Sequence, residues 1–134
     1  MGQGNIIGYE INEKTCQISY YNEQQMEPET LEVDADNYQI PLIIGKLRDT
    51  WAYGKEAKRL VSIKEGYTVT RLLSRSLAGD KIEFGEETYD AVWLLSQFIE
   101  MSLQSFPVID GIVFTVPALT EELAHMLRGI AVGM

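Results

Sequence analysis

The sequence contains few of the residues from which common structural and catalytic sites are built. Among its 134 residues there is one cysteine, Cys16, and one histidine, His125. These are too few for an internal disulfide or for the usual structural zinc sites. The sequence also lacks a Gly-x-Ser-x-Gly elbow, a Gly-x-x-x-x-Gly-Lys-Ser/Thr phosphate loop and a Cys-x-x-Cys pair. No standard catalytic constellation is therefore visible.

Basic residues and long apolar runs are also scarce. The chain has 20 acidic against 11 basic residues and a formal net charge of -9. On average it repels a nucleic-acid backbone and an anionic membrane surface, so we expect neither as a partner. No apolar run is long enough for a membrane span, and the N-terminus lacks a signal-peptide pattern. We expect a cytoplasmic location, which the lone cysteine also favours.

The remaining composition is that of one folded unit. Hydrophobic residues make up 46% of the chain, and no repeat, low-complexity segment or Pro/Gly/Ser-rich linker divides it. We therefore expect residues 1–134 to form a single domain. The sequence stops on the apolar stretch "GIAVGM" without a polar tail, which leads us to expect that the chain is a piece of a longer protein.

The opening stretch "IIGYEINEKTCQISYY" predicts a hairpin. Alternating apolar residues indicate strands over Asn5–Ile11 and Thr15–Tyr21, joined by a short turn. Such a turn can aim backbone N–H groups at a bound anion. In this turn Lys14 would attract phosphate and Glu13 would repel it, and the glycine and hydroxyl side chains of a phosphate loop are absent. The residues by themselves favour a plain hairpin, with Asn12 able to take a turn conformation.

Further along the chain, the expected elements mix strands and short helices. We expect mostly loop over 22–37, with one short strand near 31–33. A strand follows over 38–46, in which Pro41 requires an edge position or a strand entry. We then expect a strand over 51–53, a break at Gly54, a helix from 55 to about 60 and a helical stretch ending at Gly79.

The C-terminal half predicts two helices around one strand. The longer helix is expected from about 86 to 104, with Glu86 and Glu87 in its first turn. The apolar run 112–116 is typical of a strand inside a sheet, and Pro117 ends it. Thr120 can cap a final helix, whose expected buried stripe is Leu123, Leu127, Ile130 and Met134. This order of elements indicates a mixed α/β fold.

Four segments, in order, resemble the N-terminal part of the nucleotide-binding domain of the seventy-kilodalton heat-shock chaperones, within the actin-like ATPase superfamily. The opening hairpin resembles the family's first phosphate hairpin, Gly-Ile-Asp-Leu-Gly-Thr-Thr. "YQIPLIIGK" with "WAYGKEAKRL" resembles a Thr-Pro-Ser strand followed by Val-Gly-x-x-Ala-Lys. "LLSRSLAG" resembles Phe-Asp-Ala-Lys-Arg-Leu-Ile-Gly, and "IDGIVFTVPALTEELAHMLRGIAVGM" resembles the Val-Val-Thr-Val-Pro-Ala-Tyr-Phe strand and the next helix.

The resemblance implies a fold and a set of site residues. The fold is an actin-like ATPase (ribonuclease-H-like) lobe, a mixed sheet with a flanking long helix and a small helical and strand insertion at about 38–85. The intact protein would bind ATP and Mg²⁺, whereas this piece alone would bind none and be inactive. The implied residues are Asn12, Glu13, Lys14 and Thr15 at the phosphates, Glu10 at the metal through water, Arg75 in place of the catalytic lysine, and Pro117 and His125 as an interlobe relay.

Departures from the family's pattern leave the function open. Glu10 stands for an aspartate, Asn12 for the loop glycine, and Glu13 and Lys14 for a threonine pair. The chain is then either a lobe of a nucleotide-dependent switch or a degenerate, non-enzymatic scaffold that keeps the fold. A cytoskeletal or pilus-assembly relative is a third possibility. Partners would be another protein or the missing second lobe, and exposed lobe surface could drive self-association.

Overall fold

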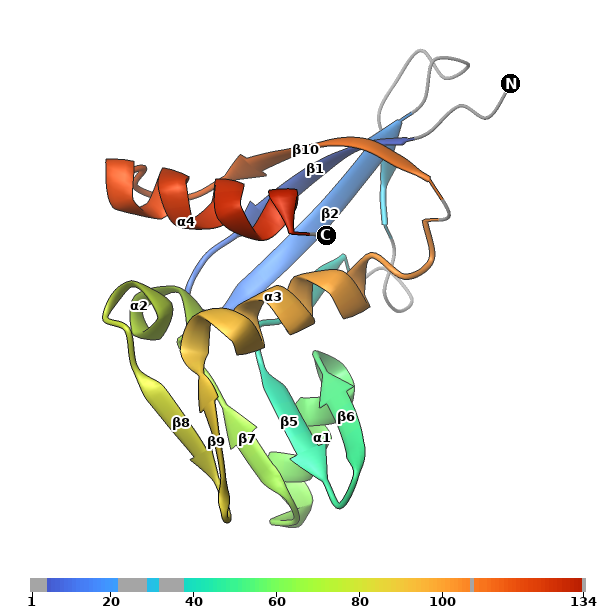
Figure 1. Cartoon of the computed structure of the whole chain (residues 1–134). Coiled ribbons are helices and arrows are strands. Elements are labelled where there is room, and N and C mark those ends of the chain that lie inside the picture. The colour runs from blue at the N-terminus through green and yellow to red at the C-terminus, as the bar shows by residue number, and fades with distance from the viewer. Residues whose placement is uncertain (1–4, 22–28, 32–37, 107, 134) are drawn as a thin grey trace.

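The computed structural model describes residues 5–21, 29–31, 38–106 and 108–133. The chain forms a main sheet flanked by two helices, and a smaller part of short strands and helices lies below this sheet in Figure 1. The mixed α/β class predicted from the sequence is confirmed.

The main sheet contains the opening hairpin. Its strands follow the order β10-β1-β2-β3, with β4 also paired to β2. Strand β1 runs antiparallel to β2 and parallel to β10. Ile7, Tyr9 and Ile11 are fully buried, because alternate residues of a strand point to the same face. The bounds are β1 (Asn5–Ile11), β2 (Thr15–Tyr21), β3 (Glu29–Thr30), β4 (Gln39–Pro41) and β10 (Ile109–Thr115).

The smaller part, residues 44–90, corresponds to the insertion predicted at about 38–85, and we call it the insertion. It is built from two small antiparallel sheets and two short helices. One sheet has the order β6-β5-β7 and the other pairs β8 with β9. Gly54 has φ 62° between β6 and α1, a conformation in which glycine carries no penalty. The bounds are β5 (Ile44–Leu47), β6 (Thr50–Tyr53), α1 (Lys55–Ile63), β7 (Tyr67–Val69), α2 (Leu72–Leu77), β8 (Lys81–Phe84) and β9 (Glu87–Asp90).

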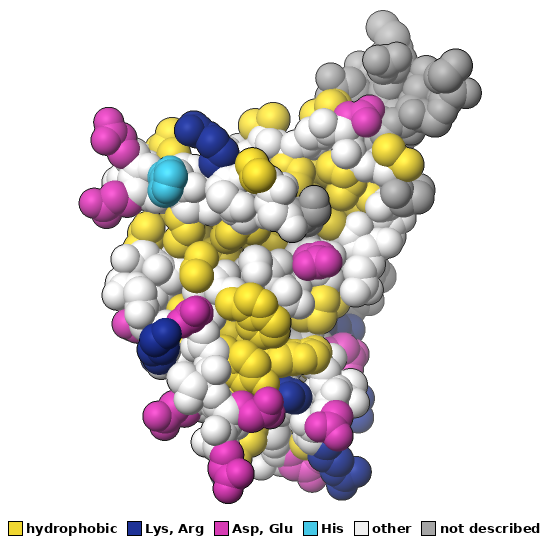
Figure 2. Space-filling model, viewed as in Figure 1, with side chains coloured by type: hydrophobic (Ala, Val, Ile, Leu, Met, Phe, Trp, Pro, Cys, Tyr) yellow, Lys and Arg dark blue, Asp and Glu magenta, His cyan; other side chains and the backbone are white. Residues whose placement is uncertain are grey.

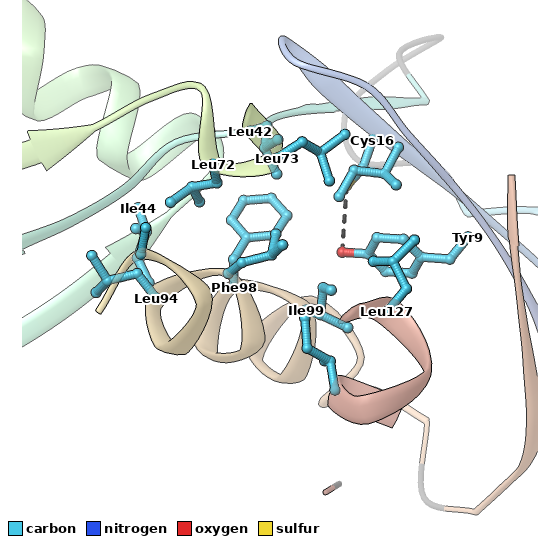
Figure 3. Close-up of a cluster of buried hydrophobic side chains, with 14 of the residues drawn as sticks. Tyr9, Cys16, Leu42, Ile44, Leu72, Leu73, Leu94, Phe98, Ile99 and Leu127 are labelled. Carbon is cyan, nitrogen blue, oxygen red and sulfur yellow. Dashed lines mark hydrogen bonds between the residues drawn. The ribbon is translucent and has the colours of Figure 1, made fainter. Parts of the chain in front are cut away.

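Two helices complete the core. Helix α3 (Ala91–Ser102) lies between the main sheet and the insertion in Figure 1, and α4 (Glu121–Val132) lies along the main sheet. Phe98 of α3 is fully buried among side chains from β5, α2 and the loop before β5 (Figure 3). Thr120 caps α4 as predicted, because its hydroxyl accepts the N–H of Leu123 at 3.1 Å.

The long helix begins later than the sequence predicts. Residues 87–90 form β9 and pair with β8, so Glu86 and Glu87 are not in a helical first turn, and that prediction is wrong. The reason is the turn at Gly85, with φ 67°, which reverses the chain into a hairpin. Helix α3 ends at Ser102, two residues before the predicted Gln104.

The other differences concern strand positions. Strand β3 ends one residue before the predicted start at Leu31, and residues 32–33 lie outside the described part. The predicted strand 38–46 is two strands, with Pro41 ending β4. Strand β10 was expected inside a sheet, but it stands at the end of the strand order among the described residues. The interior position is wrong here because an apolar run does not by itself specify neighbours on both sides, and Val113 is 62% exposed.

The predicted stripe on the last helix is confirmed as far as it is described. Leu123, Leu127 and Ile130 are buried, and Met134 lies outside the described residues. No helix in the described ranges is long and apolar enough to cross a membrane.

Candidate functional site

The residues singled out from the sequence lie mainly at one end of the main sheet. Because β1 and β10 are parallel, their carboxyl ends meet, and Glu10 lies beside Thr115 in the strand register. The turn from β1 to β2 follows directly. In Figure 1 this turn, α2 and the first turn of α4 lie at the same end of the molecule, and α2 contacts α4. The fold thus brings the hairpin, the insertion and the last helix together here.

The hairpin turn is held by its own asparagine. The Asn12 side-chain oxygen accepts the backbone N–H of Lys14 at 2.8 Å and that of Thr15 at 2.9 Å. The N–H of Asn12 is donated to the Thr15 carbonyl at 2.9 Å. An asparagine that bonds the backbone two and three residues ahead closes a tight turn. Two N–H groups of the turn are therefore bonded within the turn itself.

The next residue, Glu13, connects the turn to the insertion. Its carboxylate accepts the Ser74 backbone N–H at 2.8 Å and the Ser74 hydroxyl at 3.0 Å. Ser74 lies in the first turn of α2, whose N-cap residue Arg71 makes no side-chain capping bond and has φ 56°. A carboxylate is favoured at a helix N-terminus. Glu13 thus caps α2 from 61 residues away in sequence.

The predicted catalytic position, Arg75, follows Ser74 on α2. Its Nε donates to the Asp80 carboxylate at 3.2 Å, and both side chains are about 40% exposed. A shallow hollow of about 450 Å³ opens here. It is lined by Thr70, Arg71, Ser74, Arg75, Ala78 and Asp80. Arg75 therefore directly follows the residue that bonds the hairpin turn, but it is paired with a carboxylate of its own segment.

The predicted metal position, Glu10, is exposed on β1. It points to the face of the strand opposite the buried Tyr9 and Ile11. Within the described ranges, no three His, Cys, Asp or Glu side chains gather closely enough to hold a metal ion. Glu10 alone could hold a hydrated Mg²⁺ only with oxygen ligands supplied from elsewhere.

The two relay positions lie on the surface. Pro117 is exposed just after β10, and His125 is exposed on α4. His125 lines a shallow hollow with Glu121, Glu122 and Arg128, which Figure 2 shows as a mixed charged surface. Within the part of the chain that the structure describes, no hydrogen bond links Pro117 or His125 to the hairpin turn.

Tyr9, Cys16 and Ser102 form a buried cluster of polar side chains. Ser102 Oγ donates to the Ile99 carbonyl at 2.7 Å, so the Tyr9 hydroxyl donates to Ser102 Oγ at 2.6 Å. Cys16 Sγ lies 3.6 Å from the Tyr9 oxygen (Figure 3). Burial raises the pKa of Tyr9 well above its usual value and raises the pKa of Cys16 to about 12. The thiol is therefore protonated at neutral pH and serves as a packing residue.

Sequence reasoning missed two partners in this site, Ser74 and Asp80. Ser74 bonds Glu13, which lies 61 residues away in sequence. Asp80 pairs with Arg75 across the end of α2. The one usable signal was the lack of a capping residue before α2: Arg71 stands where Ser, Thr, Asp or Asn would be expected. That lack indicates a cap supplied by another segment.

Comparisons with known proteins identify the fold and the family. No curated protein sequence matches the chain. Among solved structures, a non-polymerising mutant of MamK bound to AMPPNP is similar, with a TM-score of 0.62 at 12% identity. MamK is an actin-like ATPase, so the actin-like fold is confirmed. The match covers 98% of this chain and 38% of the MamK chain.

No comparison singles out the heat-shock chaperones, so that finer assignment stays a prediction. The sequence model described as "Family of unknown function (DUF5716) C-terminal" matches residues 27–134. This is most of the 134 residues, and the chain therefore belongs to the DUF5716 family.

Proposed function

We propose that this chain is a non-hydrolysing, protein-binding lobe with an actin-like fold. The observation that carries the proposal is the bonding of Asn12 to the N–H groups of Lys14 and Thr15. A phosphate-binding turn needs such N–H groups directed at the anion. Here a side chain of the turn already accepts both of them, so a phosphate would have to displace two formed hydrogen bonds.

The neighbouring carboxylate supports the same proposal. Glu13 takes two donors at the start of α2, where an anion would otherwise be favoured. Its negative charge also opposes the approach of a phosphate to the turn. At the end of the sheet that would meet a nucleotide, the chain's own polar groups thus already occupy the donors that a phosphate would need. The function that this proposal assigns to the fold is the binding of partner proteins.

A second candidate is nucleotide-dependent switching or assembly in the intact protein. It is favoured by the similarity to MamK, whose solved structure contains AMPPNP. It is also favoured by two cations: Lys14 lies in the turn itself, and Arg75 follows Ser74, which bonds Glu13 of the turn. In this candidate Glu10 would hold Mg²⁺ through water, and Asn12, Glu13, Lys14 and Thr15 would rearrange to meet the phosphates. The heat-shock-chaperone form and the cytoskeletal or pilus form are variants of this candidate.

The two candidates differ in a calorimetric titration of ATP with Mg²⁺ into the intact protein. The scaffold proposal expects no saturable heat. The switch candidate expects binding that Glu10→Ala weakens and that Glu83→Ala, a matched exposed carboxylate on β8, does not change. Light scattering on addition of ATP separates assembly from switching, since only the former increases the scattered intensity.

A further inference from the structure

Five aromatic side chains form one connected group on the insertion and the start of α3. Both tryptophans of the chain belong to it. The Tyr89 and Trp93 rings stack at 5.4 Å and 13°, and the Tyr67 and Phe84 rings stack at 5.6 Å and 16°. Trp51 joins the two pairs, with its ring centroid 5.3 Å from Tyr89 and 6.2 Å from Phe84. We call these residues the aromatic patch: Trp51, Tyr67, Phe84, Tyr89 and Trp93.

Part of the aromatic patch is open to solvent. Trp93 is 41% exposed and Tyr67 is 49% exposed, whereas Phe84 between them is buried. Figure 2 shows a hydrophobic surface at the junction of the insertion and α3. Exposed tryptophan and tyrosine are enriched where proteins bind partners, because they contribute a large rigid contact area. None of its five residues belongs to the Glu13–Ser74 contact or lines the hollow around Arg75.

Lys46 holds the Trp51 and Tyr89 rings of the aromatic patch in place. Its ammonium group lies 5.1 Å from the Trp51 ring and 5.8 Å from the Tyr89 ring. It is paired with Glu87 at 3.0 Å and donates to the Tyr89 hydroxyl at 3.2 Å. Its side chain is only 12% exposed, so this cation stabilises the ring arrangement and is not presented to a ligand. The rings are therefore held in place before any partner arrives.

The rim of the patch is acidic. Glu86 lies at the tip of the β8–β9 hairpin, and Glu100 lies two turns beyond Trp93 on α3; both are exposed, whereas Glu87 is already paired with Lys46. Figure 2 shows acidic side chains on several sides of the hydrophobic surface. A partner that places cations beside its apolar contacts would gain complementary charge here.

We propose that the aromatic patch binds a basic, proline-containing, extended segment of a partner protein. Proline-containing segments are already extended before binding. Their proline rings therefore pack on exposed aromatic side chains at little cost in conformational entropy. Lysine or arginine beside the prolines would meet Glu86 and Glu100. A second copy of this chain fits less well, because it would bring like acidic rims together and the chain carries a net charge of -9.

Binding at the aromatic patch rests on the proposed protein-binding function, but the patch is a different site from the hairpin turn. The probe is a synthetic peptide of Pro-x-x-Pro repeats flanked by arginines, titrated into the intact protein. Because both tryptophans lie in the patch, their fluorescence reports binding directly. We expect saturable quenching, and we expect Trp93→Ala to weaken binding about tenfold or more. Glu100→Lys should weaken it several-fold without removing a ring.

Matched controls make the outcome decisive. Leu119→Ala alters an exposed apolar side chain between β10 and α4 and should leave peptide affinity unchanged. The same peptide with glutamates in place of arginines should bind much more weakly. The proposal is overturned if the arginine peptide gives no saturable signal, if the glutamate peptide binds equally well, or if the patch instead forms a dimer that Trp93→Ala abolishes. The ATP titration tests nucleotide binding at the hairpin turn, and the peptide titration tests the aromatic patch. The proposed function and the proposed partner can therefore fail independently of each other.

Discussion

Removal of the Glu13 carboxylate should loosen α2 and lower the stability of the whole lobe. In Glu13→Ala, the Ser74 N–H and hydroxyl lose their shared acceptor, and α2 has only six residues and no side-chain cap of its own. Loss of a helix cap costs roughly 0.5–2 kcal/mol. The contact is exposed, so solvent screening keeps the expected loss near the middle of that range, about 1 kcal/mol.

The assay is urea unfolding of residues 1–134 at fixed temperature. The wild type and the variants are compared by their unfolding midpoints, with one common dependence of the unfolding free energy on urea concentration. Glu13→Gln retains one acceptor oxygen and should lose less than Glu13→Ala. Glu83→Ala, on β8 and exposed, should change stability by less than about 0.5 kcal/mol. Hydrogen exchange of the Ser74 amide should accelerate only in the Glu13 variants. If Glu13→Ala unfolds at the same urea concentration as the wild type and Ser74 exchanges no faster, the Glu13–Ser74 contact does not hold the hairpin to the insertion.

Three further results follow from the packing. Phe98→Ala, at a fully buried position, should cost about 3–5 kcal/mol in urea unfolding; a loss below about 1 kcal/mol would contradict the core in Figure 3. Gly45→Ala places a Cβ 2.6 Å from the Tyr67 carbonyl oxygen, so it should destabilise the β5–β7 pairing by about 1–3 kcal/mol, detectable as faster amide exchange there. The pKa of Cys16 rises from 9.0 to about 12 on folding, so the folded protein keeps a proton that the unfolded chain loses. Stability should therefore be constant below about pH 9 and fall towards pH 12 by at most about 1.4 kcal/mol per pH unit from this group; Cys16→Ala should flatten that fall, and an unchanged slope would refute it.

Local periodicity was enough to predict the opening hairpin and the final helix. The strands β1 and β2 have the predicted bounds because alternation of apolar residues is a property of neighbouring positions. The Thr120 cap is likewise local. The bonding of Asn12 was only partly predicted: its turn-forming tendency is visible in the sequence, but the two N–H groups that it occupies are not.

The errors arose where local signals conflict or where partners are distant. Residues 86–104 read as one helix because two glutamates precede an apolar stripe, yet Gly85 and the alternation of Ile82 and Phe84 form a hairpin instead. The Glu13–Ser74 contact joins residues 61 positions apart, and nothing in either segment specifies the other. The edge position of β10 depends on which strands are present, which a single apolar run does not encode.

The claim that the turn from β1 to β2 is closed to phosphate is tested most directly by its own amide groups. In the intact protein, labelled with nitrogen-15 in lysine and threonine, the NMR signals of the Lys14 and Thr15 amides can be followed during titration with ATP and Mg²⁺. The account predicts that both signals shift in Asn12→Ala, which removes their acceptor, and that neither moves in the wild type when nucleotide is added. A saturable shift of both signals in the wild type on addition of nucleotide would contradict it and establish the turn as a phosphate site.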